Sequence, residues 1–125
     1  SMSVKILIAD DEPNILLSLE YLMKREGFQV LVAHNGQEAL DMIEREQPVL
    51  ALLDVMMPKK TGLEVCHLIR SGDTNKDMPI LLLTAKGRDT DIAKGLALGA
   101  NAYIVKPFST KELVQKVKSI IGTSA

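Results

Sequence analysis

The stretch that most constrains this chain covers residues 48–62, PVLALLDVMMPKKTG. It opens with an apolar run, residues 49–53, that ends at a single carboxylate, Asp54. The run is too short for a membrane span, but it suits a strand that is buried on both faces of a parallel sheet. An aspartate after such a strand is most often a turn residue or a helix cap, so Asp54 alone does not indicate a function.

Other apolar runs of the chain also end in polar residues. These runs and the residues after them are 4–9 with Asp10, Asp11 and Glu12, 79–83 with Thr84 and Ala85, and 102–105 with Lys106 and Pro107. Ligands of an open parallel sheet bind at the carboxyl edge of its strands. We therefore expect these side chains to share one functional edge.

Helix patterns alternate with the strands. Pro13 suits the first turn of a helix and Gly27 its C-terminal cap. Residues 28–33 are a further predicted strand. Helices are expected after it, over residues 62–71 and 89–98, and after residue 109, and Asn35–Glu38 and Ser109–Glu112 both have the spacing of a capping box. Five strands that alternate with five helices, without a repeat or a linker, predict a doubly wound α/β fold of three layers, helices on both faces of a five-stranded parallel sheet.

The predicted helix at residues 89–98 is weak by composition. Gly95 lies inside it, and its expected inner face is mostly alanine with Ile92 and Leu96. Sequence drift would explain this composition. A functional alternative is an element that is held loosely enough to shift, since switching motions occur in segments of low stability.

Length and charge limit the class of protein. The 125 residues predict one domain, with a core at about residues 4–121, and a net charge of −1 gives no footprint for nucleic acid or an anionic membrane. Cys66 is the single cysteine, which excludes an internal disulfide and fits a reducing compartment, so we expect a cytoplasmic protein. Neither a signal peptide nor a membrane span is apparent. Ser1 before Met2 is interpreted as a scar of tag cleavage.

The strand ends together resemble the receiver domain of two-component response regulators. The matching features are Asp10–Asp11, Asp54 with Pro58 and Gly62, Thr84–Ala85, and GANAYIVKPF at residues 99–108. The resemblance covers about residues 4–121 and implies a flavodoxin-like fold with strand order 2-1-3-4-5. In such a sheet Asp10, Asp11 and Asp54 lie close together.

Three ionised carboxylates at such distances repel each other by about 2–4 kcal/mol per pair at an effective dielectric constant near 20. Either their pKa values rise or a cation lies among them, because one Lys106 ammonium cannot neutralise three acids. A donor set of oxygens alone favours Mg²⁺ over zinc. The resemblance implies that Asp11, Asp54 and the Met56 backbone carbonyl ligate the metal, with Asp10 acting through bound water.

The resemblance also implies the chemistry. Asp54 would take a phosphoryl group from a phosphohistidine of a histidine kinase or phosphotransfer protein, while Lys106 and Thr84 bind phosphoryl oxygens. Lys106–Pro107 resembles the cis peptide of the family. The remaining residues of the site have supporting roles: Pro58, Gly62, Ala85 and Pro107 shape its loops, and Met56 and Lys86 flank the path of attacking water.

A switch follows from the same resemblance. Thr84 would move toward the phosphoryl group and Tyr103 would rotate inward, which changes the surface of the fourth helix, fifth strand and fifth helix. The domain would catalyse only its own phosphorylation and dephosphorylation, and a phosphorylation-dependent dimer is one expected output. The sequence does not name the downstream output. Lys59 and Lys60 make the loop before Gly62 more basic than is usual in the family.

Two alternatives belong to other functional classes. The first is a flavodoxin-like cofactor binder, although Asp10–Asp11–Glu12 would repel a flavin phosphate after the first strand. The second is an interaction module that is never phosphorylated.

Overall fold

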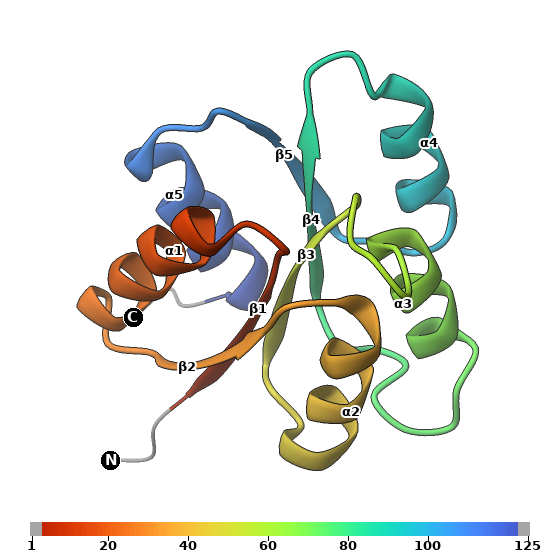
Figure 1. Ribbon diagram of the computed structural model, residues 1–125. Helices are drawn as coiled ribbons and strands as arrows, with labels where there is room; N and C mark the ends of the chain where they lie inside the picture. The colour runs from red at the N-terminus through yellow and green to blue at the C-terminus, as the bar shows by residue number, and fades with distance from the viewer. Residues whose placement is uncertain (1–3, 123–125) are drawn as a thin grey trace.

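A computed structural model describes residues 4–122; Ser1 and Met2, and with them the interpretation of Ser1, lie outside the described residues. Five parallel strands form one sheet in the order β2-β1-β3-β4-β5 (Figure 1). The strands are β1 (Lys5–Ala9), β2 (Gln29–Ala33), β3 (Leu50–Asp54), β4 (Ile80–Ala85) and β5 (Ala102–Lys106). The helices are α1 (Pro13–Arg25), α2 (Gly36–Glu46), α3 (Gly62–Arg70), α4 (Asp89–Ala97) and α5 (Thr110–Ile121). The predicted fold class and strand order are confirmed.

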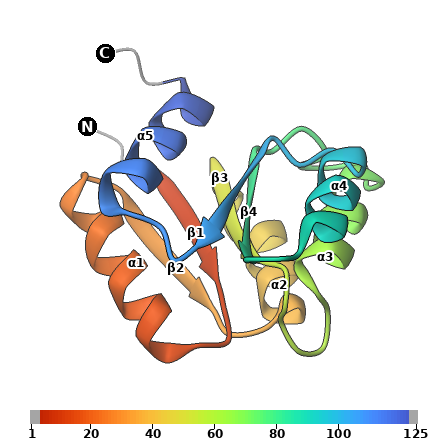
Figure 2. The same cartoon turned by 90° about the horizontal axis from the view of Figure 1, so that it is seen from above.

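The helices cover both faces of the sheet, as the view from above shows (Figure 2). α1 and α5 lie on one face, and α2, α3 and α4 lie on the other. Successive strand residues point to opposite faces. In β3, Leu52 packs with α1 and α5, whereas Leu53 packs with α2 and α3. Burial on both faces explains why β3 reads as an uninterrupted apolar run.

Three strands extend further toward the functional edge than the apolar runs predict. β3 includes Asp54, β4 includes Thr84 and Ala85, and β5 includes Lys106. A backbone hydrogen bond from Val55 N to Leu83 O, at 2.9 Å, continues the pairing beyond Asp54. The polar side chains are therefore held by the sheet itself, and their positions are fixed by its register.

Two predicted capping boxes are only half formed among the described residues. The Asn35 and Ser109 side chains accept the expected hydrogen bonds from the Glu38 and Glu112 amides. The Glu38 carboxylate, however, accepts from the backbone N–H of His34 instead of that of Asn35. A complete capping box forms at Thr61–Glu64, at the start of α3, which the sequence analysis did not identify.

The predicted inner face of α4 is wrong for its alanines and for Leu96, because both alanines of the helix are exposed. Leu96 is 44% exposed, whereas Gly95 is the buried residue of this helix. A Cβ atom at position 95 would overlap Leu82 Cδ1, so any larger residue would force the Leu82 side chain or α4 to shift. Gly95 is therefore a packing residue, and α4 is anchored to the sheet at this point rather than along an apolar stripe.

Candidate functional site

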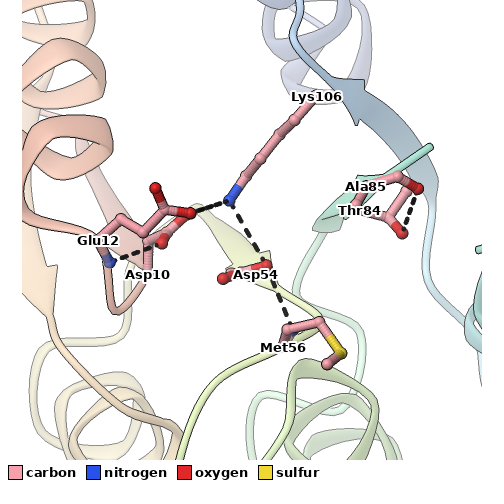
Figure 3. Close-up of polar contacts among 7 residues, drawn as sticks. All are labelled: Asp10, Glu12, Asp54, Met56, Thr84, Ala85 and Lys106. Carbon is pink, nitrogen blue, oxygen red and sulfur yellow. Dashed lines mark hydrogen bonds and ion pairs between the residues drawn. The ribbon is translucent and has the colours of Figure 1, made fainter.

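Four neighbouring strands deliver polar residues to one edge of the sheet. Asp10 follows β1, Asp54 ends β3, Thr84 lies near the end of β4 and Lys106 ends β5. The close-up shows the Lys106 side chain reaching across toward Asp10 and Asp54 (Figure 3). The gathering that the sequence predicts is thus present.

Asp10 is fully buried and both of its carboxylate oxygens are hydrogen-bonded. Oδ1 accepts from the backbone N–H of Glu12 at 2.9 Å, and Oδ2 accepts from Lys106 Nζ at 2.7 Å. A buried carboxylate needs such partners because burial disfavours its charged form. Asp10 therefore positions Lys106, and each of its oxygens keeps a lone pair that can accept from a metal-bound water.

Lys106 connects the acids of the site. Besides Asp10, its Nζ lies 3.6 Å from Asp54 Oδ1 and 4.0 Å from Glu12 Oε1. Burial alone lowers the pKa of Lys106, but the hydrogen bond to Asp10 and the charges of Asp54 and Glu12 outweigh it and raise the pKa above its ordinary value. The ammonium consequently stays charged at neutral pH.

Asp54 is also buried, and its surroundings disfavour its charge. Burial raises the pKa of Asp54 to about 6 from 3.8, and the charge of Asp10 adds to this, while Lys106 and the backbone N–H of Met56 act in the opposite direction. The Met56 N–H donates to Asp54 Oδ1 at 3.2 Å. The one lysine thus compensates the carboxylates only in part, as the sequence analysis expected.

The three aspartates can offer oxygen ligands to one cation. One oxygen each from Asp10, Asp11 and Asp54 lies within 4.8 Å of the others, and Asp11 is exposed to solvent. A small hollow of about 310 Å³ lies beside them, lined by Asp11, Glu12, Asp54, Met56, Ala85 and Lys106. No histidine or cysteine contributes to the cluster. Such a donor set suits a hard divalent cation such as Mg²⁺.

The loop after Asp54 is held against the strand by Gly62. A Cβ atom at position 62 would lie 2.5 Å from the backbone oxygen of Asp54, so a larger residue would displace the strand end. The Gly62 N–H also donates to Val55 O at 3.1 Å. Gly62 thus starts α3 directly beside the cluster, whereas Pro58 and Lys59 lie on the exposed part of the loop.

Thr84 and Tyr103 lie apart from the carboxylates. Thr84 is buried, but its hydroxyl makes only a long hydrogen bond, 3.5 Å, to the carbonyl oxygen of Ala85 (Figure 3). Tyr103 is 36% exposed, with Lys116 Nζ 5.7 Å from the centre of its ring. The Thr84 hydroxyl therefore has no strong hydrogen-bond partner among the described residues.

The other predicted residues surround the hollow. Met56 and Ala85 line it, and Met56, Ala85 and Lys86 are all exposed. Lys106–Pro107 is a cis peptide bond, as the resemblance implied. Cys66 and His67 have no place in the site: Cys66 is buried in the core and His67 is exposed on α3.

Glu12 is a site residue to which the sequence analysis gave no role. Its backbone N–H binds Asp10, and its side chain lines the hollow near Lys106. The signal in the sequence was its position two residues after Asp10, the spacing of an Asx turn.

Comparison with known proteins identifies the family. The sequence matches the response regulator receiver domain over residues 6–118. The chain belongs to this family. Its structure resembles that of a response regulator from Chloroflexus aurantiacus, with 36% identity over 97% of this chain and 99% of the other, and a TM-score of 0.92.

Two further solved receiver domains are similar. One belongs to a sensor histidine kinase of Pseudomonas aeruginosa, with 28% identity over 98% of this chain and all of the other (100%), a TM-score of 0.89, and a magnesium ion coordinated in its active-site cleft. The other is the chemotaxis response regulator CheY4 of Vibrio cholerae, with 29% identity over 95% and 99% of the two chains and a TM-score of 0.88.

The chain is therefore a receiver domain of two-component signalling. The alternative of a flavodoxin-like cofactor binder is set aside by this match. Its acidic cluster fits the phosphoacceptor site of such a domain. Within residues 4–122, no helix has the length and apolar character to cross a bilayer.

Proposed function

We propose that Asp54 is the phosphoryl acceptor of this receiver domain. The observation that carries the proposal is that Asp54 lines the hollow and its Oδ2 accepts no hydrogen bond from the described residues, whereas both oxygens of Asp10 are engaged. An Asp54 oxygen attacks phosphorus, the bond from phosphorus to the donor histidine nitrogen breaks, and that nitrogen keeps the electron pair. The domain catalyses only its own phosphorylation and dephosphorylation, and it transforms no separate substrate.

Other residues of the site bind the phosphoryl oxygens, hold the metal ion and control the access of water. Lys106 holds a positive charge 3.6 Å from Asp54 Oδ1, where it neutralises charge on a phosphoryl oxygen, and the Thr84 hydroxyl donates to another. Asp11, Asp54 and the Met56 carbonyl would hold Mg²⁺, with Asp10 bound through water. When bound, the ion neutralises charge on the carboxylates and on the transferred group. The exposed Met56 and Lys86 side chains flank the path of the water that hydrolyses the acyl phosphate.

The phosphohistidine donor belongs to a histidine kinase or a histidine phosphotransfer protein. A larger groove, about 730 Å³ in volume, supports this partner. It is lined by α1 residues between Ile15 and Arg25 and by the segment from Lys106 to Phe108. It is largely apolar, and it shares Glu12, Ala85 and Lys106 with the hollow beside Asp54. A helical donor docked along α1 would therefore reach the acceptor. We place the domain in the cytoplasm, where Cys66 stays a free thiol.

Phosphoryl incorporation tests the acceptor. Wild-type protein that is incubated with acetyl phosphate and Mg²⁺ should gain the mass of one phosphoryl group, and Asp54→Asn should gain none because an amide is not a nucleophile here. Asp73→Asn, an exposed acid in the loop after α3, is the matched control and should behave as wild type. Equal labelling of Asp54→Asn and wild type would overturn the proposal. The absence of labelling in wild type would favour an interaction module that is never phosphorylated.

The switch depends on Thr84. A hydrogen bond to a charged group contributes about 1.5–3 kcal/mol, and a two-state element needs about 5.5 kcal/mol of differential affinity to pass from 1:99 to 99:1. Thr84→Ala should therefore still bind the phosphoryl analogue beryllofluoride, but leave the switch incomplete, with Tyr103 largely outward.

Nuclear magnetic resonance measures this outcome. With beryllofluoride, wild type should show amide and Tyr103 ring shifts over residues 86–108, and Thr84→Ala only small shifts near Asp54. Shifts of the same size and extent in both proteins would mean that Thr84 does not couple the site to α4, β5 and α5.

A further inference from the structure

A groove of about 750 Å³ lies between α3 and α4, two helices that are side by side on the face of the sheet opposite α1 (Figures 1 and 2). Leu63 and Leu68 of α3 and Ala97 and Leu98 at the end of α4 give it an apolar lining. Leu68 is 44% exposed and Ala97 is exposed as well. Leu63 and Leu98 are half-buried against the core, and together with the exposed Leu68 and Ala97 they form one apolar hollow that a partner can cover.

The charged residues of this groove are mainly cationic. Lys60 and Lys94 line it, and in the described part of the chain neither makes an ion pair. Glu64 is the one acid of the lining, and one of its oxygens already accepts a hydrogen bond from the Thr61 N–H. Two unpaired ammonium groups beside an apolar lining are complementary to a partner that is apolar and acidic.

The shape of the groove indicates the form of that partner. On α3, Leu63 and Leu68 line the groove from successive turns of the helix. On the α4 side, Lys94 and Leu98 also lie one turn apart. A groove that follows more than one turn of two adjacent helices accommodates a third helix, which would contact it through apolar residues at i, i+3, i+4 and i+7.

We propose that the α3–α4 groove is a docking site for an acidic amphipathic helix of a partner protein. The apolar residues of that helix contact Leu63, Leu68 and Leu98, and carboxylates on its flanks pair with Lys60 and Lys94. The groove shares no lining residue with the hollow at Asp54, so the proposal goes beyond phosphoryl transfer and can fail independently of it.

A labelled peptide tests the site. The probe is a fluorescein-tagged helical peptide with leucines at i, i+3, i+4 and i+7 and glutamates on the flanks, titrated with the full chain at low ionic strength. Leu68→Ser and Lys94→Glu should each weaken its binding about tenfold, because one removes apolar contact and the other reverses a charge. Added salt should weaken wild-type binding. A peptide with lysines in place of the glutamates should prefer Lys94→Glu to wild type.

Matched controls lie on the opposite face. Leu17→Ser removes a leucine that is 64% exposed on α1, and Lys111→Glu reverses an exposed lysine on α5; both should bind the peptide as wild type does. Circular dichroism verifies folding of each variant. The proposal would be overturned if the peptide did not bind wild type, or if Leu68→Ser bound it as tightly as wild type does. It would also be overturned if Leu17→Ser lost as much affinity as Leu68→Ser. So would sedimentation that shows a dimer abolished by Leu68→Ser, because a second copy would then occupy the groove.

Discussion

Lys106→Met should lower the free energy of unfolding of the metal-free protein by about 3–5 kcal/mol at neutral pH, the range for breaking a buried ion pair. Methionine preserves the apolar stem of lysine but removes the ammonium. Asp10, which is 0% exposed, then loses its 2.7 Å partner, and its repulsion with Asp54 is no longer offset. Urea denaturation in the presence of EDTA measures the difference.

Two further variants separate this effect from a general loss of charge. Lys86→Met, which removes an exposed ammonium near the same sheet edge, should change the free energy of unfolding by less than about 0.5 kcal/mol. Adding Asp10→Asn to Lys106→Met should recover much of the lost stability, since the amide oxygen can still accept from the Glu12 N–H without a buried charge. A loss below about 1 kcal/mol in Lys106→Met would show that Lys106 does not compensate the cluster.

Asp54→Asn should have the opposite effect and stabilise the metal-free protein above about pH 6. The pKa of Asp54 is about 6 in the folded protein against 3.8 for the free side chain, so between these values the folded state binds more protons than the unfolded state. Wild-type stability therefore falls as pH rises through this window, by up to roughly 3 kcal/mol. Asparagine carries no charge and removes this dependence.

The pH profile decides whether this explanation holds. In EDTA, the variant should be more stable than wild type at about pH 8, and the difference should shrink toward zero near about pH 4. Mg²⁺ should then raise the stability of wild type by about 1.4 kcal/mol at tenfold excess over its Kd, and that of the variant by less. A difference between the two proteins that is independent of pH would exclude Asp54 titration as its cause.

The fold and the gathering of polar side chains at one sheet edge could be predicted because both follow from strong local patterns. Uninterrupted apolar runs such as residues 49–53 indicate buried parallel strands, and the polar residue after each run marks the carboxyl edge. Asp54 and Lys106 are far apart in the chain, but parallel strands bring their ends together. The strand order came from the resemblance to receiver domains rather than from the runs themselves.

The remaining details depend on tertiary contacts that no local pattern contains. Gly95 was interpreted as a weakness of α4, yet it is buried because Leu82 of β4 occupies the space of a side chain. The Glu38 carboxylate has the spacing of a capping box but finds the N–H of His34 within reach instead. Glu12 acquires its place beside Lys106 only once β1 and β5 have been brought to the same edge.

Chemical trapping of the phosphorylated residue is the most direct test of Asp54 as the acceptor. Borohydride reduces an aspartyl phosphate to homoserine, and peptide mass spectrometry then locates that residue in the chain. After reaction of wild type with acetyl phosphate and Mg²⁺, we expect homoserine at Asp54 and unmodified aspartate at Asp10 and Asp11. Homoserine at Asp10, at Asp11 or at an exposed acid such as Asp73, with Asp54 intact, would contradict the assignment.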